Sequence, residues 1–67
     1  MMINFIEELH TFQHGNKEAR VYKAEYGFGC RFFKDKLWIK DEVYTEHSEM
    51  YAENAAENYV LGIKNVR

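Results

Sequence analysis

The chain has 67 residues, of which 46% are hydrophobic and 30% charged, with a net charge of −2 at pH 7. This length permits a single domain, and its eleven aromatic side chains supply enough apolar area for a folded core. No run approaches the ~18 apolar residues of a membrane span, and we expect no signal peptide. The single cysteine, Cys30, excludes an internal disulfide and fits a reducing cytoplasm.

The first expected element is a helix over Asn4–Phe12. Its apolar residues recur at helical spacing: Phe5, Ile6, Leu9 and Phe12. Asn4 can cap the free amides at the start, and Gly15-Asn16 suits the end, because both residues tolerate a left-handed conformation. The segment Ile3–Ile6 taken alone would also suit an edge strand.

From Ala19 to Tyr44 the apolar period changes to two, which predicts three antiparallel strands in a meander. Hairpin turns are expected near Tyr26-Gly27 and at Asp35-Lys36. The face expected to be covered carries the following side chains: Phe28, Cys30, Phe32, Leu37, Ile39 and Val43.

A second helix is expected after Ser48, which is a good N-cap, and Gly62 should fray or end it. Its apolar stripe consists of Ala52, Ala55, Ala56, Tyr59, Val60 and Ile63. The sequence therefore predicts one α+β domain over residues 1–67. Its order is α-β-β-β-α, a three-stranded antiparallel meander with both helices packed on one face.

The segment Ser48-Glu49-Met50-Tyr51-Ala52-Glu53-Asn54-Ala55-Ala56 has a serine cap followed by alanines at fixed spacing. With the α-β-β-β-α order, residues 19–63 resemble the shape of a double-stranded-RNA-binding domain. That family places lysines after the serine and after the first alanine, where this chain has Glu49, Met50 and Glu53. Carboxylates at those positions repel phosphates, so we expect no RNA binding of the family's kind.

Two further segments, residues 15–22 (GNKEARVY) and 51–62 (YAENAAENYVLG), resemble small uncharacterised proteins of marine tailed phages that infect cyanobacteria. The proline-free composition, rich in Asn, Glu, Lys and Tyr, is similar too. The resemblance implies an infected bacterial cytoplasm as the setting. It also implies a class of small proteins that often bind host machinery.

Charge is distributed unevenly along the chain. Residues 17–40 carry seven bases and three acids, whereas residues 41–58 carry six acids and no Lys or Arg. This pattern is typical of ordinary solvated surfaces. It also fits an acidic helix that steers the molecule onto a basic partner, or self-association through opposite charges.

We expect neither a metal site nor a catalytic site. His10 and His14 would share one face of the first expected helix, but a closed zinc site needs four ligands, and only Cys30, His47 or a glutamate could complete it. Cys30 lies mid-strand on the face expected to be covered, which suits a small buried residue. The chain has no glycine-rich phosphate loop and no Ser/His/Asp set, so we expect no enzyme and no cofactor.

The other sheet face is expected to carry aromatic and basic side chains: Arg31, Phe33, Trp38, Lys40 and Tyr44, with Val21 and Lys23 beside them. Such a set describes a protein interface, a stacking platform for single-stranded nucleic acid, or rings covered by lysine stems. On the last helix, Met50 and Tyr51 would extend a contact surface or a dimer seam, and Glu49, Glu53 and Glu57 would set orientation. We therefore expect a non-catalytic phage protein that binds a host protein; the alternative is a nucleic-acid-binding module.

Overall fold

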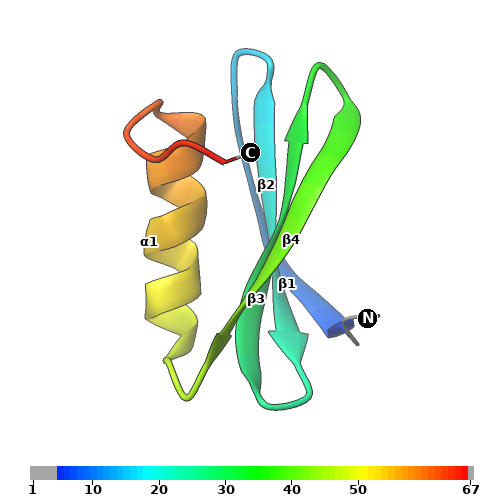
Figure 1. Ribbon diagram of the computed structural model, residues 1–67, viewed down its shortest axis with the longest axis vertical. Coiled ribbons are helices and arrows are strands. Elements are labelled where there is room, and N and C mark those ends of the chain that lie inside the picture. Colours follow the sequence, from blue (N-terminus) through cyan, green and yellow to red (C-terminus); the bar gives the residue numbers. More distant parts are fainter. Residues whose placement is uncertain (1–4, 67) are drawn as a thin grey trace.

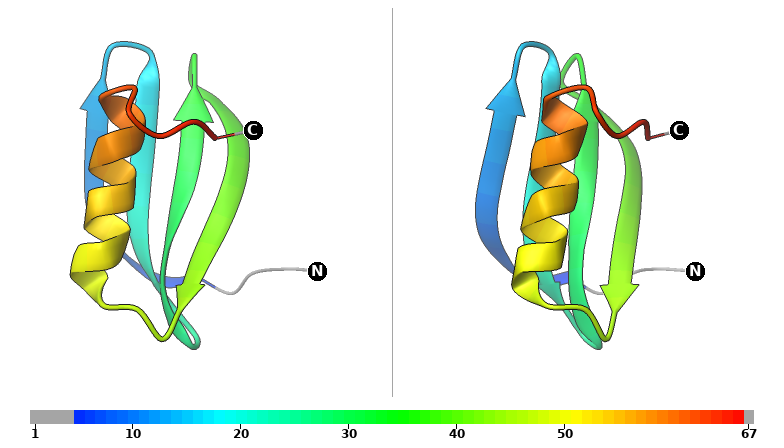
Figure 2. Two further views of the ribbon diagram at one scale, coloured as in Figure 1. Left: turned by 60° about the vertical axis from the view of Figure 1, so that its left-hand side comes forward. Right: turned by 90° about the vertical axis from the view of Figure 1, so that its left-hand side faces the viewer.

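The computed structural model describes residues 5–66, which form a four-stranded antiparallel sheet with one helix across one face (Figure 1). The strands follow chain order: β1 (Phe5–His14), β2 (Lys17–Ala24), β3 (Gly27–Lys34) and β4 (Leu37–Thr45). The helix α1 (Glu49–Val60) comes last and lies over β2, with β1 and β3 on either side (Figure 2). No helix in residues 5–66 is long and apolar enough to cross a membrane.

The helix expected over Asn4–Phe12 is wrong, because this segment forms β1 and pairs with β2 along its length. Two register shifts explain the misleading pattern, since each inserts an extra residue, at Ile6 and at Leu9. In a regular strand, residues three apart lie on opposite faces. Because Leu9 is itself an inserted residue, Leu9 and Phe12 both contact the core. Two core residues three apart are also what a helix would give, so the segment has helical spacing. The proposed cap Asn4 lies outside the described residues.

The predicted α-β-β-β-α order is therefore wrong. The observed order is β-β-β-β-α, with a single helix in place of two on one face; the general α+β class holds. The resemblance to a double-stranded-RNA-binding domain used the α-β-β-β-α order. The described residues lack the first helix of that order.

Each pair of neighbouring strands is joined by a two-residue turn. Gly15-Asn16, expected to end a helix, instead connects β1 to β2. The turn expected at Asp35-Lys36 is confirmed, and both residues have positive φ (53° and 67°), as a type I′ hairpin requires. The remaining turn is Glu25-Tyr26, one residue earlier than predicted. At one end of the sheet, Asn16 Nδ2 donates a hydrogen bond of 3.0 Å to Asp35 Oδ1, which ties two turns together.

The helix expected after Ser48 is confirmed: the Ser48 side chain accepts a bond from the backbone N–H of Tyr51, and the helix ends before Gly62. Small side chains let α1 lie close to the sheet, since Ala52 and Ala56 are fully buried. The core against which they pack consists of Ala19, Val21, Cys30, Phe32, Tyr59 and Val60.

The prediction for the covered face is correct for β3 and only partly correct for β4. Cys30 and Phe32 are fully buried, but Leu37 is 70% exposed, and Val43 pairs with Gly29 on the opposite face. For Val43 the cause is a register shift between β3 and β4, where one extra residue of β4 is inserted beside Phe32 and Phe33. From that point on, the alternation along β4 changes phase relative to a regular strand.

Candidate functional site

The candidate site is the sheet face that α1 does not cover, which we call the open face. Within residues 5–66, α1 is the sole helix, and it and the segment after it lie on the other side of the sheet (Figure 2). Directly paired residues of antiparallel strands project to the same side, so the register assigns the members of this face. They are Phe5, Glu8, Thr11, Gln13, Glu18, Arg20, Tyr22, Ala24, Gly27, Gly29, Arg31, Phe33, Trp38, Asp41, Val43 and Thr45.

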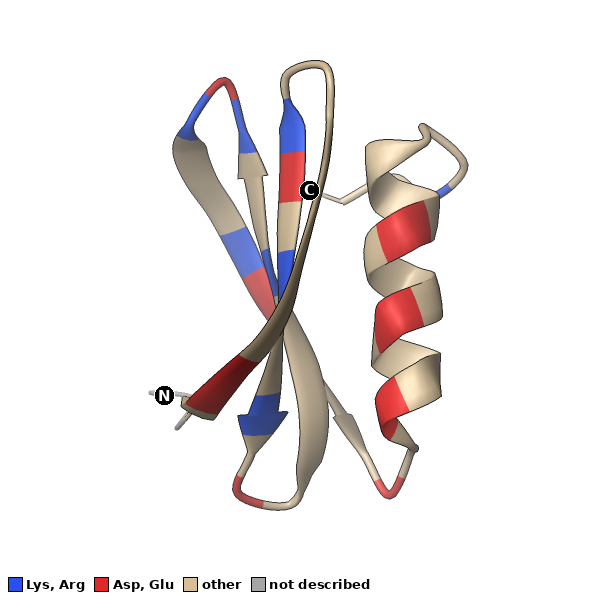
Figure 3. Ribbon diagram, turned by 180° about the vertical axis from the view of Figure 1, so that it is seen from behind, with Lys and Arg blue, Asp and Glu red and all other residues tan. Residues whose placement is uncertain are grey.

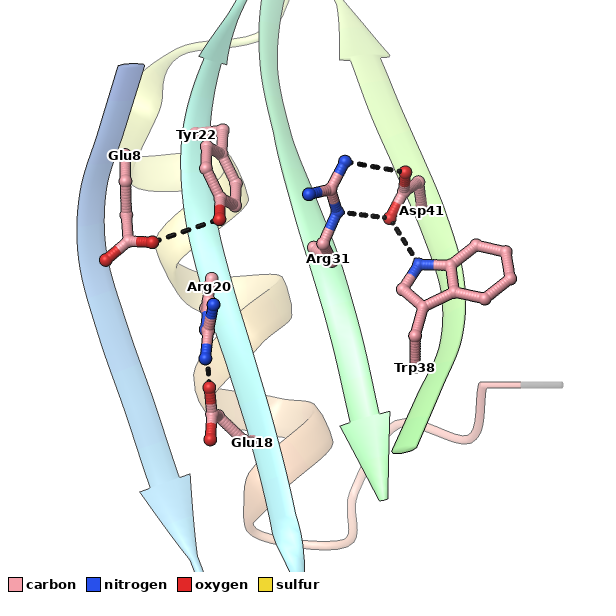
Figure 4. Close-up of polar contacts among 7 residues, drawn as sticks. All are labelled: Glu8, Glu18, Arg20, Tyr22, Arg31, Trp38 and Asp41. Carbon is pink, nitrogen blue, oxygen red and sulfur yellow. Dashed lines mark hydrogen bonds and ion pairs between the residues drawn. The ribbon is translucent and has the colours of Figure 1, made fainter. Parts of the chain in front are cut away.

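A cross-strand cluster of Arg31, Asp41 and Trp38 holds the β3–β4 part of the open face (Figure 4). Arg31 Nε and Nη2 donate to the two carboxylate oxygens of Asp41 at 3.0 and 3.3 Å, and Trp38 Nε1 donates to Asp41 Oδ1 at 2.8 Å. The hydrogen bond to Asp41 raises the pKa of the Arg31 guanidinium, which therefore stays charged. The cluster fixes the orientation of an indole that is 58% exposed.

Aromatic rings cover the β1–β2 part of the open face. The rings of Phe5 and Tyr22 are stacked with centroids 4.8 Å apart, and the Arg31 guanidinium lies 5.1 and 5.3 Å from them. Gly29 makes this possible, because a Cβ at that position would lie 2.8 Å from Phe5 Cε1. The Tyr22 hydroxyl donates to Glu8 Oε1 at 3.0 Å, so the stack is also held at its polar end.

Both guanidiniums on the open face are paired with carboxylates. Arg20 lies 4.7 Å above the Phe33 ring and donates to the Glu18 carboxylate, which raises the pKa of the guanidinium. Together with the Arg31–Asp41 pair and Glu8, this gives three carboxylates and two guanidiniums on the face. The open face is therefore not the basic platform expected from the sequence.

The structure divides the residues predicted to share a binding surface. Arg31, Phe33 and Trp38 do lie together on the open face, since Phe33 pairs with Trp38. Lys40 and Tyr44 lie on the helix side: Lys40 pairs with Phe32, and the ring of Tyr44 meets the Tyr51 ring edge-on. The residues expected beside them, Val21 and Lys23, also belong to the helix side.

The predicted contact residues of α1 are separated from the open face by the sheet. They are Glu49, Met50, Tyr51, Glu53 and Glu57. Figure 3 shows the acidic residues of α1 as a stripe along the helix. A single flat partner surface therefore cannot contact both Trp38 and this stripe, and the two sets need separate explanations.

Cys30 is placed as a core residue. Its side chain is fully buried, and its Sγ donates to the carbonyl oxygen of Ala52 at 3.1 Å. Burial raises the pKa of the thiol to about 12, so it stays protonated at neutral pH, when the thiolate is the reactive form. This environment is unfavourable for a nucleophile.

Several residues of the open face escaped the sequence analysis, chiefly Arg20, Tyr22 and Asp41. One signal for Asp41 exists. The two-residue turn at Asp35-Lys36 in a regular hairpin would place Arg31 opposite Lys40, and like charges directly opposite are unfavourable. Inserting one residue in β4 replaces that pairing with Arg31 opposite Asp41.

Comparison of the chain with protein-family models, with curated proteins and with solved structures finds no match. A function therefore has to be inferred from the chemistry and geometry of the open face.

Proposed function

We propose that this chain is a non-catalytic protein-binding module whose contact surface is the open face, with Trp38 as its anchor. The proposal rests on one observation, the exposed indole of Trp38. Asp41 fixes its orientation through a hydrogen bond, and Arg31 in turn binds Asp41. Tryptophan, tyrosine and arginine dominate the affinity of protein interfaces. A side chain already fixed before binding loses less conformational entropy when the partner arrives.

The composition of the face favours a protein over a phosphate polymer. An aromatic centre with paired charges around it matches the usual arrangement of a protein interface. Because the guanidiniums of Arg20 and Arg31 already bind carboxylates, neither is free to neutralise a phosphate without breaking that pair. In the setting that the phage resemblance implies, the partner is a protein of the infected bacterial host.

The proposal is tested by capturing partners on the immobilised chain with two matched variants. Trp38→Ala removes the anchor, whereas Met50→Ala removes a similarly exposed apolar side chain from α1. Loss of a central anchor costs about 2 kcal/mol or more, so we expect at least roughly 30-fold weaker binding for Trp38→Ala. Binding by Met50→Ala should equal that of the wild type. Far-UV circular dichroism verifies that both variants fold.

Three results would contradict the proposal. One is a partner that Trp38→Ala retains, and another is a partner that Met50→Ala loses instead. The third is oligonucleotide binding at low salt that weakens steeply as salt is added, which would favour the nucleic-acid alternative. A concentration-dependent dimer that Trp38→Ala dissociates would assign the open face to a second copy of the chain.

A further inference from the structure

A separate cluster of three ionisable side chains lies on the helix side of the sheet, where β1 runs beside the first half of α1. His10 Nε2 is 3.1 Å from Glu49 Oε2 and 2.9 Å from Glu53 Oε2. One possible metal-ligand atom from each of the three residues lies within 4.8 Å of those of the other two. The cluster therefore joins an edge strand to the helix through groups that can all ligate a metal.

Local structure explains why these side chains meet. Glu49 and Glu53 are four residues apart on α1, so their carboxylates lie on one side of the helix. His10 follows the inserted residue Leu9 and pairs with Val21, whose side chain is buried under α1. The register shift at Leu9 thus places the imidazole of His10 on the helix side.

We propose that His10, Glu49 and Glu53 bind one divalent transition-metal ion of the zinc class, with water in the remaining position. Imidazole nitrogen and carboxylate oxygen are both zinc ligands, and zinc sites with three protein ligands hold a water in the fourth position. The imidazole favours zinc, cobalt or nickel over magnesium and calcium, which prefer oxygen ligands alone.

The two distances from the imidazole of His10 to the carboxylates are close to what such an ion requires. Ligand atoms about 2.0–2.1 Å from a tetrahedral metal are separated from one another by roughly 3.3–3.5 Å. The two distances from His10 Nε2, 3.1 and 2.9 Å, are shorter by about half an ångström or less. Small rotations of the half-buried Glu49 and Glu53 side chains would bring these distances to the required values.

The electrostatics of the cluster also favour a dication. Glu49 and Glu53 have like charges at neighbouring positions of the helix, which destabilises it when both are ionised. An ion of charge +2 compensates both carboxylates at once, and it ties β1, an edge strand, to α1.

The test is calorimetric titration of the full chain with ZnCl₂, and with CoCl₂ as a spectroscopic probe. We expect one ion per chain and, with Co²⁺, visible absorption bands characteristic of low coordination number. His10→Ala and Glu53→Gln should each weaken Zn²⁺ binding at least 10-fold. The matched controls His14→Ala and Glu57→Gln, which remove the same groups from the same elements, should bind as the wild type does.

A second readout is thermal unfolding with and without Zn²⁺. The metal should raise the melting temperature of the wild type and leave that of His10→Ala unchanged, because binding to the folded state alone stabilises it. Absence of Zn²⁺ binding, or binding unchanged in His10→Ala, would overturn the inference. Trp38→Ala should retain full metal binding, so failure of this inference and failure of the proposed protein contact are distinguishable.

Discussion

Replacing Asp41 by asparagine tests the cluster that fixes the orientation of Trp38. The substitution preserves size and shape but leaves one carbonyl oxygen where two charged oxygens accept three hydrogen bonds. The side chain of Asp41 is 15% exposed and that of Arg31 35% exposed, so solvent screens part of their attraction. Hydrogen bonds to charged groups contribute about 1.5–3 kcal/mol, and we expect a net loss near the lower end, about 1.5 kcal/mol.

A loss of that size is measurable in a chain this short. At about 0.05–0.15 kcal/mol per residue, the whole domain is stable by roughly 3–10 kcal/mol. Urea unfolding followed by far-UV circular dichroism measures the change in the free energy of unfolding. Because Trp38 is the single tryptophan, its fluorescence reports independently on release of the indole.

Two comparisons make the test specific. Asp35→Asn makes the same chemical change in the exposed turn between β3 and β4, and its amide oxygen can still accept the bond from Asn16 Nδ2. It should therefore alter the free energy of unfolding by no more than about 0.5 kcal/mol. A double-mutant cycle with Arg31→Met should give a coupling energy of about 1 kcal/mol. An unchanged free energy of unfolding together with unchanged Trp38 fluorescence in Asp41→Asn would refute the reasoning.

Phe32→Ala should cost about 3–5 kcal/mol and leave little folded protein by circular dichroism, since this side chain is fully buried; a fully folded variant would contradict this. Cys30 should react with a thiol reagent far more slowly in the native chain than in denaturant, and equal rates would disprove its burial. Burial of Glu42 opposes ionisation, but Tyr44 and Lys64 outweigh it and lower its pKa. Tyr44→Phe should therefore reduce the free energy of unfolding at pH 7. The difference in this free energy between variant and wild type should shrink as the pH falls through the lowered pKa of Glu42. Urea unfolding at pH 7 and at a pH below that pKa tests this.

Local signals were sufficient to predict the last two hairpin strands and the helix. Asp35-Lys36 favours a tight turn, and Ser48 followed by a stripe of small apolar residues defines where α1 begins and which side is buried. These features depend on residues close in sequence, so a single chain reveals them. The fully buried side chains of β3, Cys30 and Phe32, follow from the same alternation.

The errors arise where an extra residue is inserted in a strand. The insertions in β1 convert an alternating pattern into one with helical spacing at Leu9 and Phe12. The insertion in β4 moves Val43 to the open face and Lys40 to the helix side. Such insertions are settled by pairing with a neighbouring strand, and the pattern of one strand alone does not reveal them.

The candidate site depends on the same pairing. Alternation along the strands is enough to group Trp38, Phe33 and Arg31 on one face. Their contacts with Asp41 of β4 and Tyr22 of β2 depend on the register between strands. The contact of His10 with Glu49 and Glu53 joins residues about forty positions apart, across a strand and a helix. No spacing rule along the chain anticipates it.

The most direct test of the protein-binding face is photo-crosslinking, in cells that express the chain, from one position on each side of the sheet. A benzoyl-phenylalanine replaces Phe33 on the open face in one variant and Tyr51 on α1 in the other. The account predicts a discrete protein adduct from position 33 and none from position 51. Adducts formed from position 51 alone, or nucleic acid attached at position 33, would contradict it.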